Sequence, residues 1–243
     1  SNTVTKTDGD NYVLVSTNHS CTIDVDSSKN VITVTYALDN WKDSEDGDTE
    51  TGGDEIPDYQ QALIKYVSNE NGSVAPQLDV ITLSQKDDNN KYSGEATASS
   101  KATAKKGYAF DYWMKDSSTD WKGWDPDLSD NFTAQGGQTY TYTANFAEDK
   151  NGDGTPDKYQ VFVNFVSADE NQGTVFDKDG AATNTGTTQV YTFENHATSG
   201  DVTPSLAGVD VKAKEGFAFD IWTKTAPATD TDTGVNPAET LED

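Results

Sequence analysis

The chain repeats itself, and this repetition constrains the fold more than any other feature of the sequence. Residues 107–113 read GYAFDYW and residues 216–222 read GFAFDIW. Nearer the N-terminus, residues 56–60 (IPDYQ) resemble residues 155–160 (TPDKYQ), and each block runs into a similar apolar stretch. Matched blocks in the same order indicate a duplicated folding unit of about one hundred residues, with Tyr59 matched to Tyr159.

Each copy is predicted to consist of β-strands. Residues 61–67 and 161–166 are short, rich in β-branched and aromatic residues, and followed by turn-forming residues. Two further strands are expected at 80–83 and 108–114. From 139 to 146, Thr and Asn alternate with Tyr, Ala and Phe, which is the period of two expected for a strand with one buried face.

One stretch is open to two interpretations. Residues 95–106 (EATASSKATAKK) fit either a short helix or a strand, because their Ser and Thr content weakens the helical preference. No long helical period is present elsewhere. The expected fold class is therefore mainly β, as small α+β repeats in tandem.

The repeat also predicts the domain organisation. An apolar strand at 31–36, followed by an acidic stretch, matches the order seen around 139–157. Unit two has no counterpart of the strand at 139–146, so its last strand is expected to be missing. The predicted segments are the C-terminal part of a preceding repeat (1–38), an acidic linker (39–55), repeat unit one (56–146), a second acidic linker (147–157) and repeat unit two (158–243).

The charge of the chain excludes several classes of function. There are 42 acidic residues against 17 basic ones, all of them Lys, and the formal net charge is −25. Nucleic acids and anionic membrane surfaces would repel such a chain, whereas divalent cations would be attracted. No stretch approaches the roughly 18 apolar residues of a membrane span, so we expect no membrane insertion in this segment. The single cysteine, Cys21, excludes an intramolecular disulfide.

The second linker has the spacing of a calcium loop. Residues 149–157 follow the pattern D-x-N-x-D-G-x-x-D, which places oxygen-bearing side chains at positions 1, 3, 5 and 9 and glycine at position 6. Gln160 stands where an EF-hand has its bidentate Glu, and a flexible acidic linker explains the same residues without a metal. The acids of the first linker lack this spacing and indicate a solvated run. The predicted Ca²⁺ ligands are Asp149, Asn151, Asp153, Thr155 and Asp157.

Aromatic residues suggest a second kind of site. Trp113 and Trp222 occupy equivalent positions, and one Trp at a fixed place in each unit is typical of a core residue. Trp121 and Trp124, by contrast, lie in a turn-rich loop that occurs in unit one alone. Together with Tyr112 they are a candidate surface for stacking on a sugar, although one Trp closing over the sheet edge would also account for them.

The residues that repeat resemble those of a known family. KATAKKGYAFDYW at 101–113, followed by the Thr/aromatic strand that ends in ANF, resembles the internalin B-repeat, also called the Listeria–Bacteroides repeat. The linker DKNGDGTPDKYQ is similar to thrombospondin type 3 and dockerin-like calcium loops, and residues 11–36 are similar to the end of a mucin-binding-type repeat. The family implies small β-grasp-like units with little helix, strung in tandem in Gram-positive surface proteins, and no catalytic residues.

These observations define the expected function. We expect a non-enzymatic stalk or adhesin segment, secreted and held at the cell surface or cell wall, whose partner is a host or bacterial surface glycan or protein. A carbohydrate-binding module is the alternative. Acid–base chemistry has few participants, because His19 and His196 are the only histidines. The chain is expected to be a monomer.

Overall fold

The computed structural model describes residues 11–17, 22–42, 53–116, 120–177 and 186–223. The chain divides into two compact units, Ser1–Pro156 and Asp157–Asp243, and the boundary falls within the predicted second linker. The expected mainly β fold is confirmed, since the helical elements of the described residues are short 3-10 turns. These turns are η1 (Ser27–Lys29), η2 (Asp58–Gln60), η3 (Asp157–Tyr159) and η4 (Glu194–His196).

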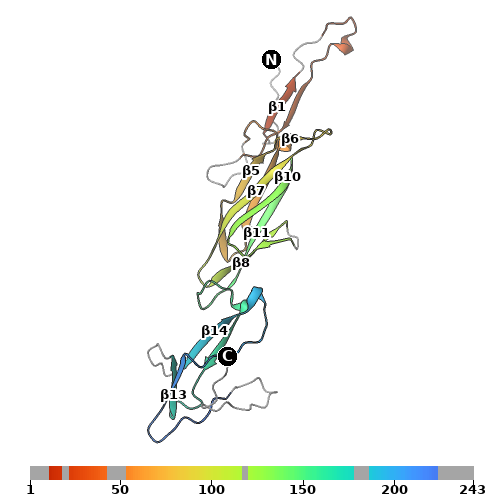
Figure 1. Cartoon of the computed structure of the whole chain (residues 1–243). Coiled ribbons are helices and arrows are strands. Elements are labelled where there is room, and N and C mark those ends of the chain that lie inside the picture. Colours follow the sequence, from red (N-terminus) through yellow and green to blue (C-terminus); the bar gives the residue numbers. More distant parts are fainter. Residues whose placement is uncertain (1–10, 18–21, 43–52, 117–119, 178–185, 224–243) are drawn as a thin grey trace. The chain divides into compact units, whose positions relative to one another are not determined.

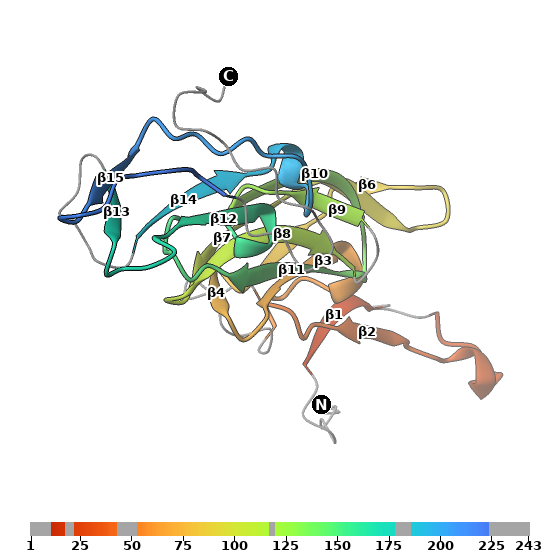
Figure 2. The same cartoon turned by 90° about the horizontal axis from the view of Figure 1, so that it is seen from below.

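Repeat unit one is a sandwich of two sheets (Figure 1, Figure 2). One sheet has the strand order β5-β3-β11-β8-β9, and the other has the order β10-β7-β4 with β6 paired to β7. Within the first sheet, β3 and β11 run parallel and the remaining neighbours are antiparallel. The strands are β3 (Gln61–Ser68), β4 (Gly72–Ala75), β5 (Leu78–Thr82), β6 (Gln85–Lys86), β7 (Tyr92–Ala104), β8 (Tyr108–Lys115), β9 (Asp120–Gly123), β10 (Asp127–Gln135) and β11 (Thr139–Glu148).

The strands predicted at 61–67, 80–83, 108–114 and 139–146 correspond to β3, β5, β8 and β11. The stretch 95–106, which was open between helix and strand, lies mostly in β7, where buried and exposed residues alternate without interruption. Small residues such as Ala98 and Ala102 on its buried face allow the two sheets to approach closely. Strand β11 continues to Glu148, two residues beyond the predicted end of unit one, and it shortens the second linker accordingly.

The core of unit one lies between the two sheets. Trp113 on β8 is fully buried there, as its repeated position predicted. It packs with Tyr142 and Phe146 from β11, the central strand that sits between β3 and β8. Burying three large aromatic side chains compensates for the low aliphatic content, since each ring removes a large apolar area from water.

Repeat unit two has the same local pairings in a smaller set of strands. Strand β12 (Gln160–Phe165) pairs with β14 (Thr187–Thr192), and β13 (Gly173–Asp177) pairs with β15 (Val209–Ala213). These correspond to the pairs β3–β5 and β4–β7 of unit one. The short turns η2 and η3 begin 99 residues apart, at Asp58 and Asp157. The sequence match of Tyr59 with Tyr159 is therefore shifted by one residue, and Tyr59 corresponds to Lys158.

Individual hydrogen bonds recur at matching places in the two units. The Lys105 ammonium donates to the backbone oxygen of Glu70 at 2.6 Å, and the Lys214 ammonium donates to that of Glu170 at 2.5 Å. In both units a glycine with φ of +86° follows two residues later, a conformation that favours glycine. The same side-chain contact and the same turn therefore connect the paired strands to the GYAFDYW and GFAFDIW motifs.

The N-terminal hairpin resembles the last two paired strands of unit one. Strands β1 (Tyr12–Thr17) and β2 (Val34–Leu38) pair antiparallel, as β8 and β11 do. The backbone N–H of Asp39 donates to Asn11, as that of Asp149 donates to Gly107, each at 2.9 Å. The register irregularity also falls at the same step, beyond the pair Leu14–Tyr36 in one hairpin and Phe110–Phe146 in the other. That 1–38 ends a preceding repeat stays a prediction.

Several sequence-based predictions fall outside the described residues. They include the acid run of the first linker between 43 and 50, Cys21 and His19, and the C-terminal stretch 224–243. Among the residues that are described, no helix has the length and apolar character needed to cross a membrane.

Candidate functional site

The three aromatic residues singled out for sugar stacking lie together in unit one. The rings of Trp121 and Trp124 are 4.9 Å apart between centroids, and those of Tyr112 and Trp124 are 6.2 Å apart. Trp121 is 46% exposed, whereas the other two are partly buried. Both contacts are edge-to-face, which is a favourable geometry for aromatic pairs. The cluster thus presents one well-exposed indole held by two neighbouring rings rather than a single flat platform.

Part of this aromatic cluster lies on a β-strand, although the sequence indicated a loop. Trp121 lies on β9, the edge strand that pairs with β8, so the description of the cluster as a turn-rich loop is wrong for this residue. The turn after β9 is tied to the core, because the indole N–H of Trp113 donates to the backbone oxygen of Pro126 at 3.3 Å. Pro126 has no N–H to donate to a strand ladder, and Gly123 has a φ of +122°, a conformation that favours glycine. These two residues account for the turn that follows β9.

A charged network lies beside the cluster. The Asp130 carboxylate accepts the hydroxyl hydrogen of Tyr142 at 2.7 Å, and the ammonium groups of Lys115 and Lys122 lie 3.7 and 3.5 Å from it. Burial, followed by the hydrogen bond to Asp130, raises the pKa of Tyr142 well above its ordinary value. Lys115 also lies 3.5 Å from the centre of the Phe132 ring, a cation–π contact. One carboxylate, that of Asp130, is thus paired with the ammonium groups of Lys115 and Lys122. These contacts favour a fixed orientation of the three side chains.

A second site is the loop that follows β11. Asp149 is 4% exposed, and its carboxylate accepts three backbone N–H bonds from its own loop. The donors are Gly152 at 2.7 Å, Asp153 at 3.2 Å and Gly154 at 2.9 Å. A carboxylate that accepts several backbone N–H bonds holds a loop in one conformation, because each bond is assisted by the charge. Asp149 therefore orders the loop that leads from unit one to unit two.

The loop that leads into unit one is built in the same way. Asp39 is 5% exposed and directly follows β2, and its carboxylate accepts the N–H groups of Asp54 at 2.9 Å and Glu55 at 3.0 Å. Asp58, in the next turn, accepts the N–H groups of Asn40 and Trp41. We did not predict Asp39 from the sequence, although its signal was present: an Asp stands immediately after the last strand of the hairpin, as Asp149 does.

The remaining predicted calcium ligands are only partly brought together. Asn151 and Asp153 are hydrogen-bonded to each other at 2.8 Å, and Asp153 also accepts the N–H of Thr155 at 2.8 Å. Asp157 begins η3 in the second compact unit. Within the part of the chain that the structure describes, no three or more His, Cys, Asp or Glu side chains are grouped so that they could hold a metal ion. Carboxylate oxygens that accept an N–H retain a second lone pair, so the residue types still suit a hard cation.

Comparison with known proteins yields no relative. No protein-family model matches the chain, and neither a curated protein nor a solved structure matches it.

Proposed function

We propose that the chain is a non-catalytic repeat module of a secreted bacterial cell-surface protein, acting as a stalk or adhesin segment. The observation that carries this proposal is the parallel pairing of β3 with β11. These are the strands through which unit one is joined to the chain on either side. The resemblance to internalin B-repeats, and the two loops ordered by Asp39 and Asp149, support the same proposal.

The geometry of this pair suits a segment under tension. In a parallel pair, the start of one strand and the end of the other lie at opposite ends of the ladder. Tension that enters at Gln61 and leaves at Glu148 would therefore pull the strands along their own direction. The six residue pairs from Leu63–Thr139 to Ser68–Ala144 would be strained together, whereas a hairpin pulled from its open end loses its bonds one at a time. A stalk needs this kind of resistance.

Single-molecule force spectroscopy tests the proposal. The whole chain is pulled from its two ends, and the force at which unit one unfolds is compared with that of a second tether geometry. In the control, the handles are attached at Gln60 and Gln138, which flank neighbouring strand ends, so that the same ladder is unzipped. We expect a clearly higher unfolding force in the end-to-end geometry. Equal forces in the two geometries would contradict the role as a stalk.

The exposed indole of Trp121 supports a second candidate function, a carbohydrate-binding module. Sugars stack on exposed aromatic faces, and the acidic and amide groups of nearby turns could supply hydrogen bonds. Affinity electrophoresis in gels that contain polysaccharides is the test. Trp121→Ala should abolish any retardation, whereas Tyr12→Ala, which removes an aromatic ring of 43% exposure on the N-terminal hairpin, should leave it unchanged. Equal effects of the two substitutions would argue against a sugar site on this cluster.

The loop at Asp149 supports a proposal about calcium. Asp149, Asn151, Asp153 and Thr155 would hold the ion, which would offset the repulsion among acids near the joint. A thermal melt with excess calcium should lie above a melt with chelator, and Asp153→Ala should remove the difference. A melt that calcium does not shift, even at about 10⁻³ M, the weak end of extracellular sites, would refute this proposal.

A further inference from the structure

Gln61, the first residue of β3, has a buried oxygen that lacks a partner. The residue is 1% exposed, and its amide nitrogen donates to the Asp54 carboxylate at 2.7 Å. In the part of the chain that the structure describes, its amide oxygen Oε1 is the one buried side-chain nitrogen or oxygen without a hydrogen-bond partner. A buried acceptor left in this state costs about 1–3 kcal/mol. Folded proteins rarely leave such an atom unsatisfied, so this oxygen indicates a ligand.

The oxygen lies beside two acidic side chains. Because the nitrogen and oxygen of an amide group are held close together, Oε1 lies near the Asp54 carboxylate that the nitrogen contacts. The backbone N–H of Asp54 in turn donates to the buried carboxylate of Asp39 at 2.9 Å. The ion pairs formed among the described residues include neither Asp39 nor Asp54. Two acidic charges therefore lie at this junction without an ammonium group to balance them.

The junction also has the backbone geometry of the Asp149 loop. Asp54 corresponds to Asp153, because each donates its N–H to the buried carboxylate that follows the preceding strand, that of Asp39 or Asp149. Each of the two also accepts the N–H of the residue two positions later, at 2.9 Å in the first loop and 2.8 Å in the second. A longer stretch of chain separates Asp39 from Asp54, so spacing along the sequence does not reveal this match.

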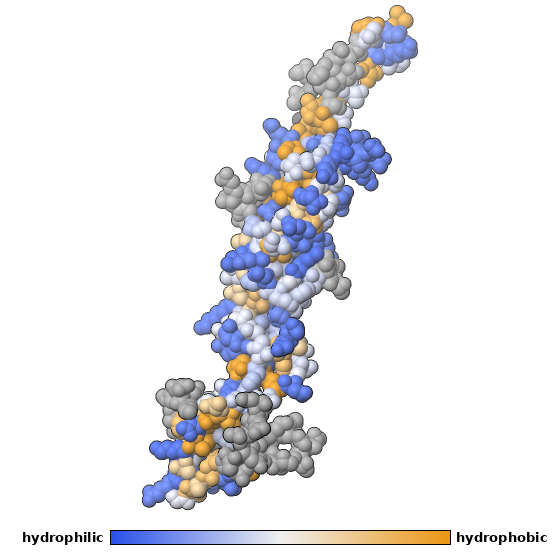
Figure 3. Space-filling view, viewed as in Figure 1, coloured by the Kyte–Doolittle hydropathy of each residue, from blue (hydrophilic) through white to orange (hydrophobic). Residues whose placement is uncertain are grey.

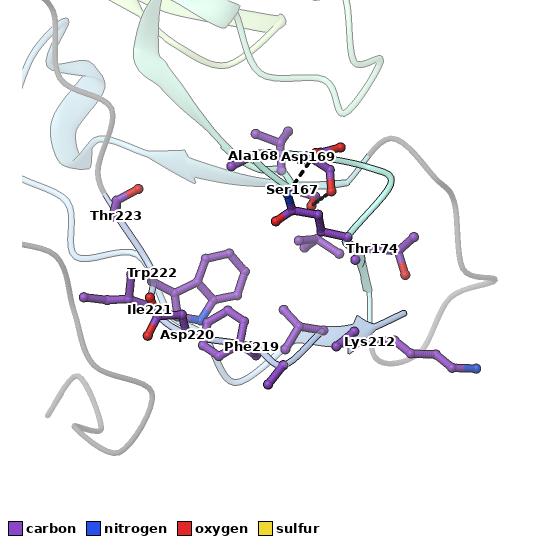
Figure 4. A pocket seen from close by; sticks show the side chains of 17 residues that line it. Ser167, Ala168, Asp169, Thr174, Lys212, Phe219, Asp220, Ile221, Trp222 and Thr223 are labelled. Atoms are coloured by element: carbon purple, nitrogen blue, oxygen red, sulfur yellow. Dashed lines mark hydrogen bonds between the residues drawn. The ribbon is translucent and has the colours of Figure 1, made fainter. Parts of the chain in front are cut away.

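The described cavity of about 230 Å³ does not supply the missing partner. It lies in repeat unit two, where Phe219 and Trp222 line one side and Ser167 and Ala168 lie across from them (Figure 4). None of the residues that line it belongs to the junction before unit one. A small ligand at the junction itself is therefore needed to satisfy Gln61. A cation is favoured over a water molecule, because it also offsets the two acidic charges.

We propose that Asp39, Asp54 and the Oε1 atom of Gln61 bind a calcium ion at the junction between β2 and β3. Carboxylate and amide oxygens are the ligands that this hard cation prefers, and water and main-chain oxygens complete its six to eight ligands. The set has two acidic side chains, so it is distinct from groups of three or more, which are absent from the described residues. The inference rests on Gln61 and not on the calcium site proposed at Asp149, and either site can fail alone.

Diffuse binding of calcium is the background that the experiment has to exclude. Hydrophilic side chains are spread over much of the visible surface (Figure 3), and the net charge of −25 attracts divalent cations wherever acids are exposed. Binding is therefore measured by equilibrium dialysis in about 0.15 M KCl, which screens exposed charges. Free calcium is raised to about 5 mM, above the dissociation constants of weak extracellular sites.

Asp54→Asn removes the charge and keeps an oxygen that can accept the N–H of Ile56. This variant should bind about one calcium ion fewer per chain than the unaltered protein. Asp88→Asn, at an exposed position between β6 and β7, removes the same charge and should bind as many ions as the unaltered protein. Equal binding by the two variants overturns the proposal.

Asp153→Asn tests the Asp149 loop in the same assay. If both sites bind, Asp54→Asn and Asp153→Asn each lose about one ion and their combination loses about two. If the Asp149 loop alone binds, Asp54→Asn has no effect and the present proposal fails while the other stands. If the junction before unit one alone binds, the loss follows Asp54→Asn and Asp153→Asn has no effect.

Gln61→Glu gives a test of opposite sign, because it replaces the amide with a carboxylate of nearly the same shape. In chelator, two carboxylates would meet where the amide now donates to Asp54, so the thermal melt should lie below that of the unaltered chain. In calcium, the added charge becomes a ligand, and the affinity should rise by roughly tenfold or more. A Gln61→Glu chain that binds calcium no more tightly, and whose melt calcium does not recover, overturns the proposal.

Discussion

Replacing Asp149 with alanine should destabilise repeat unit one far more than the loss of one surface charge. Asp149 is buried, and its carboxylate accepts three backbone N–H bonds. A hydrogen bond to a charged group contributes about 1.5–3 kcal/mol. The three donors lie on an exposed loop where water can replace the carboxylate, so the loss is below the sum of the three. We expect about 3 kcal/mol.

Urea unfolding followed by tryptophan fluorescence measures this loss. Four of the five tryptophans lie before Pro156, so the signal reports mainly on the first compact unit. With a slope of about 1.5 kcal/mol per molar urea, a loss of 3 kcal/mol lowers the midpoint by roughly 2 M. The measurement is made in chelator, which removes any contribution from calcium.

Asp88→Ala is the matched control, because it removes the same charge from an exposed position between β6 and β7. Its midpoint should change by no more than about 0.3 M, as expected for a surface substitution. If Asp149→Ala and Asp88→Ala unfold at the same urea concentration, the carboxylate does not order the junction and the reasoning is wrong.

Three further predictions concern the core of the repeats. Because the pKa of Tyr142 is raised in the folded state, stability should be fully present below pH 10 and fall above it by up to about 1.4 kcal/mol per pH unit; Tyr142→Phe should reduce that slope in urea titrations at pH 9–11. Trp113→Ala should cost about 3–5 kcal/mol, and Trp222→Ala, at a partly exposed site, clearly less; near-ultraviolet circular dichroism melts compare them. Gly72→Ala should cost about 1–3 kcal/mol by crowding the Phe146 ring, and Phe146→Leu should restore part of the loss in a double-mutant cycle.

The candidate sites differ in how far the sequence could predict them. Tyr112, Trp121 and Trp124 were grouped from their composition, and the structure does bring their rings together. The calcium motif identified Asp149 by its spacing, but the spacing did not reveal that its carboxylate would bind backbone N–H groups. Asp39 was missed because a single Asp after a strand has no pattern of its own until a second junction is seen to match it.

The sequence by itself indicated the duplication, several of the strands and the alternating burial of the strand at 139–146. These follow from local properties: a period of two, β-branched and aromatic residues, and turn residues at matching places. The tertiary structure alone decided which strands are neighbours. It places β11, the last strand of unit one, in the middle of the sheet and parallel to β3. Among the residues described in unit two, β12 pairs with β14 and β13 pairs with β15. Pairing between strands far apart in the chain depends on packing that no local stretch specifies.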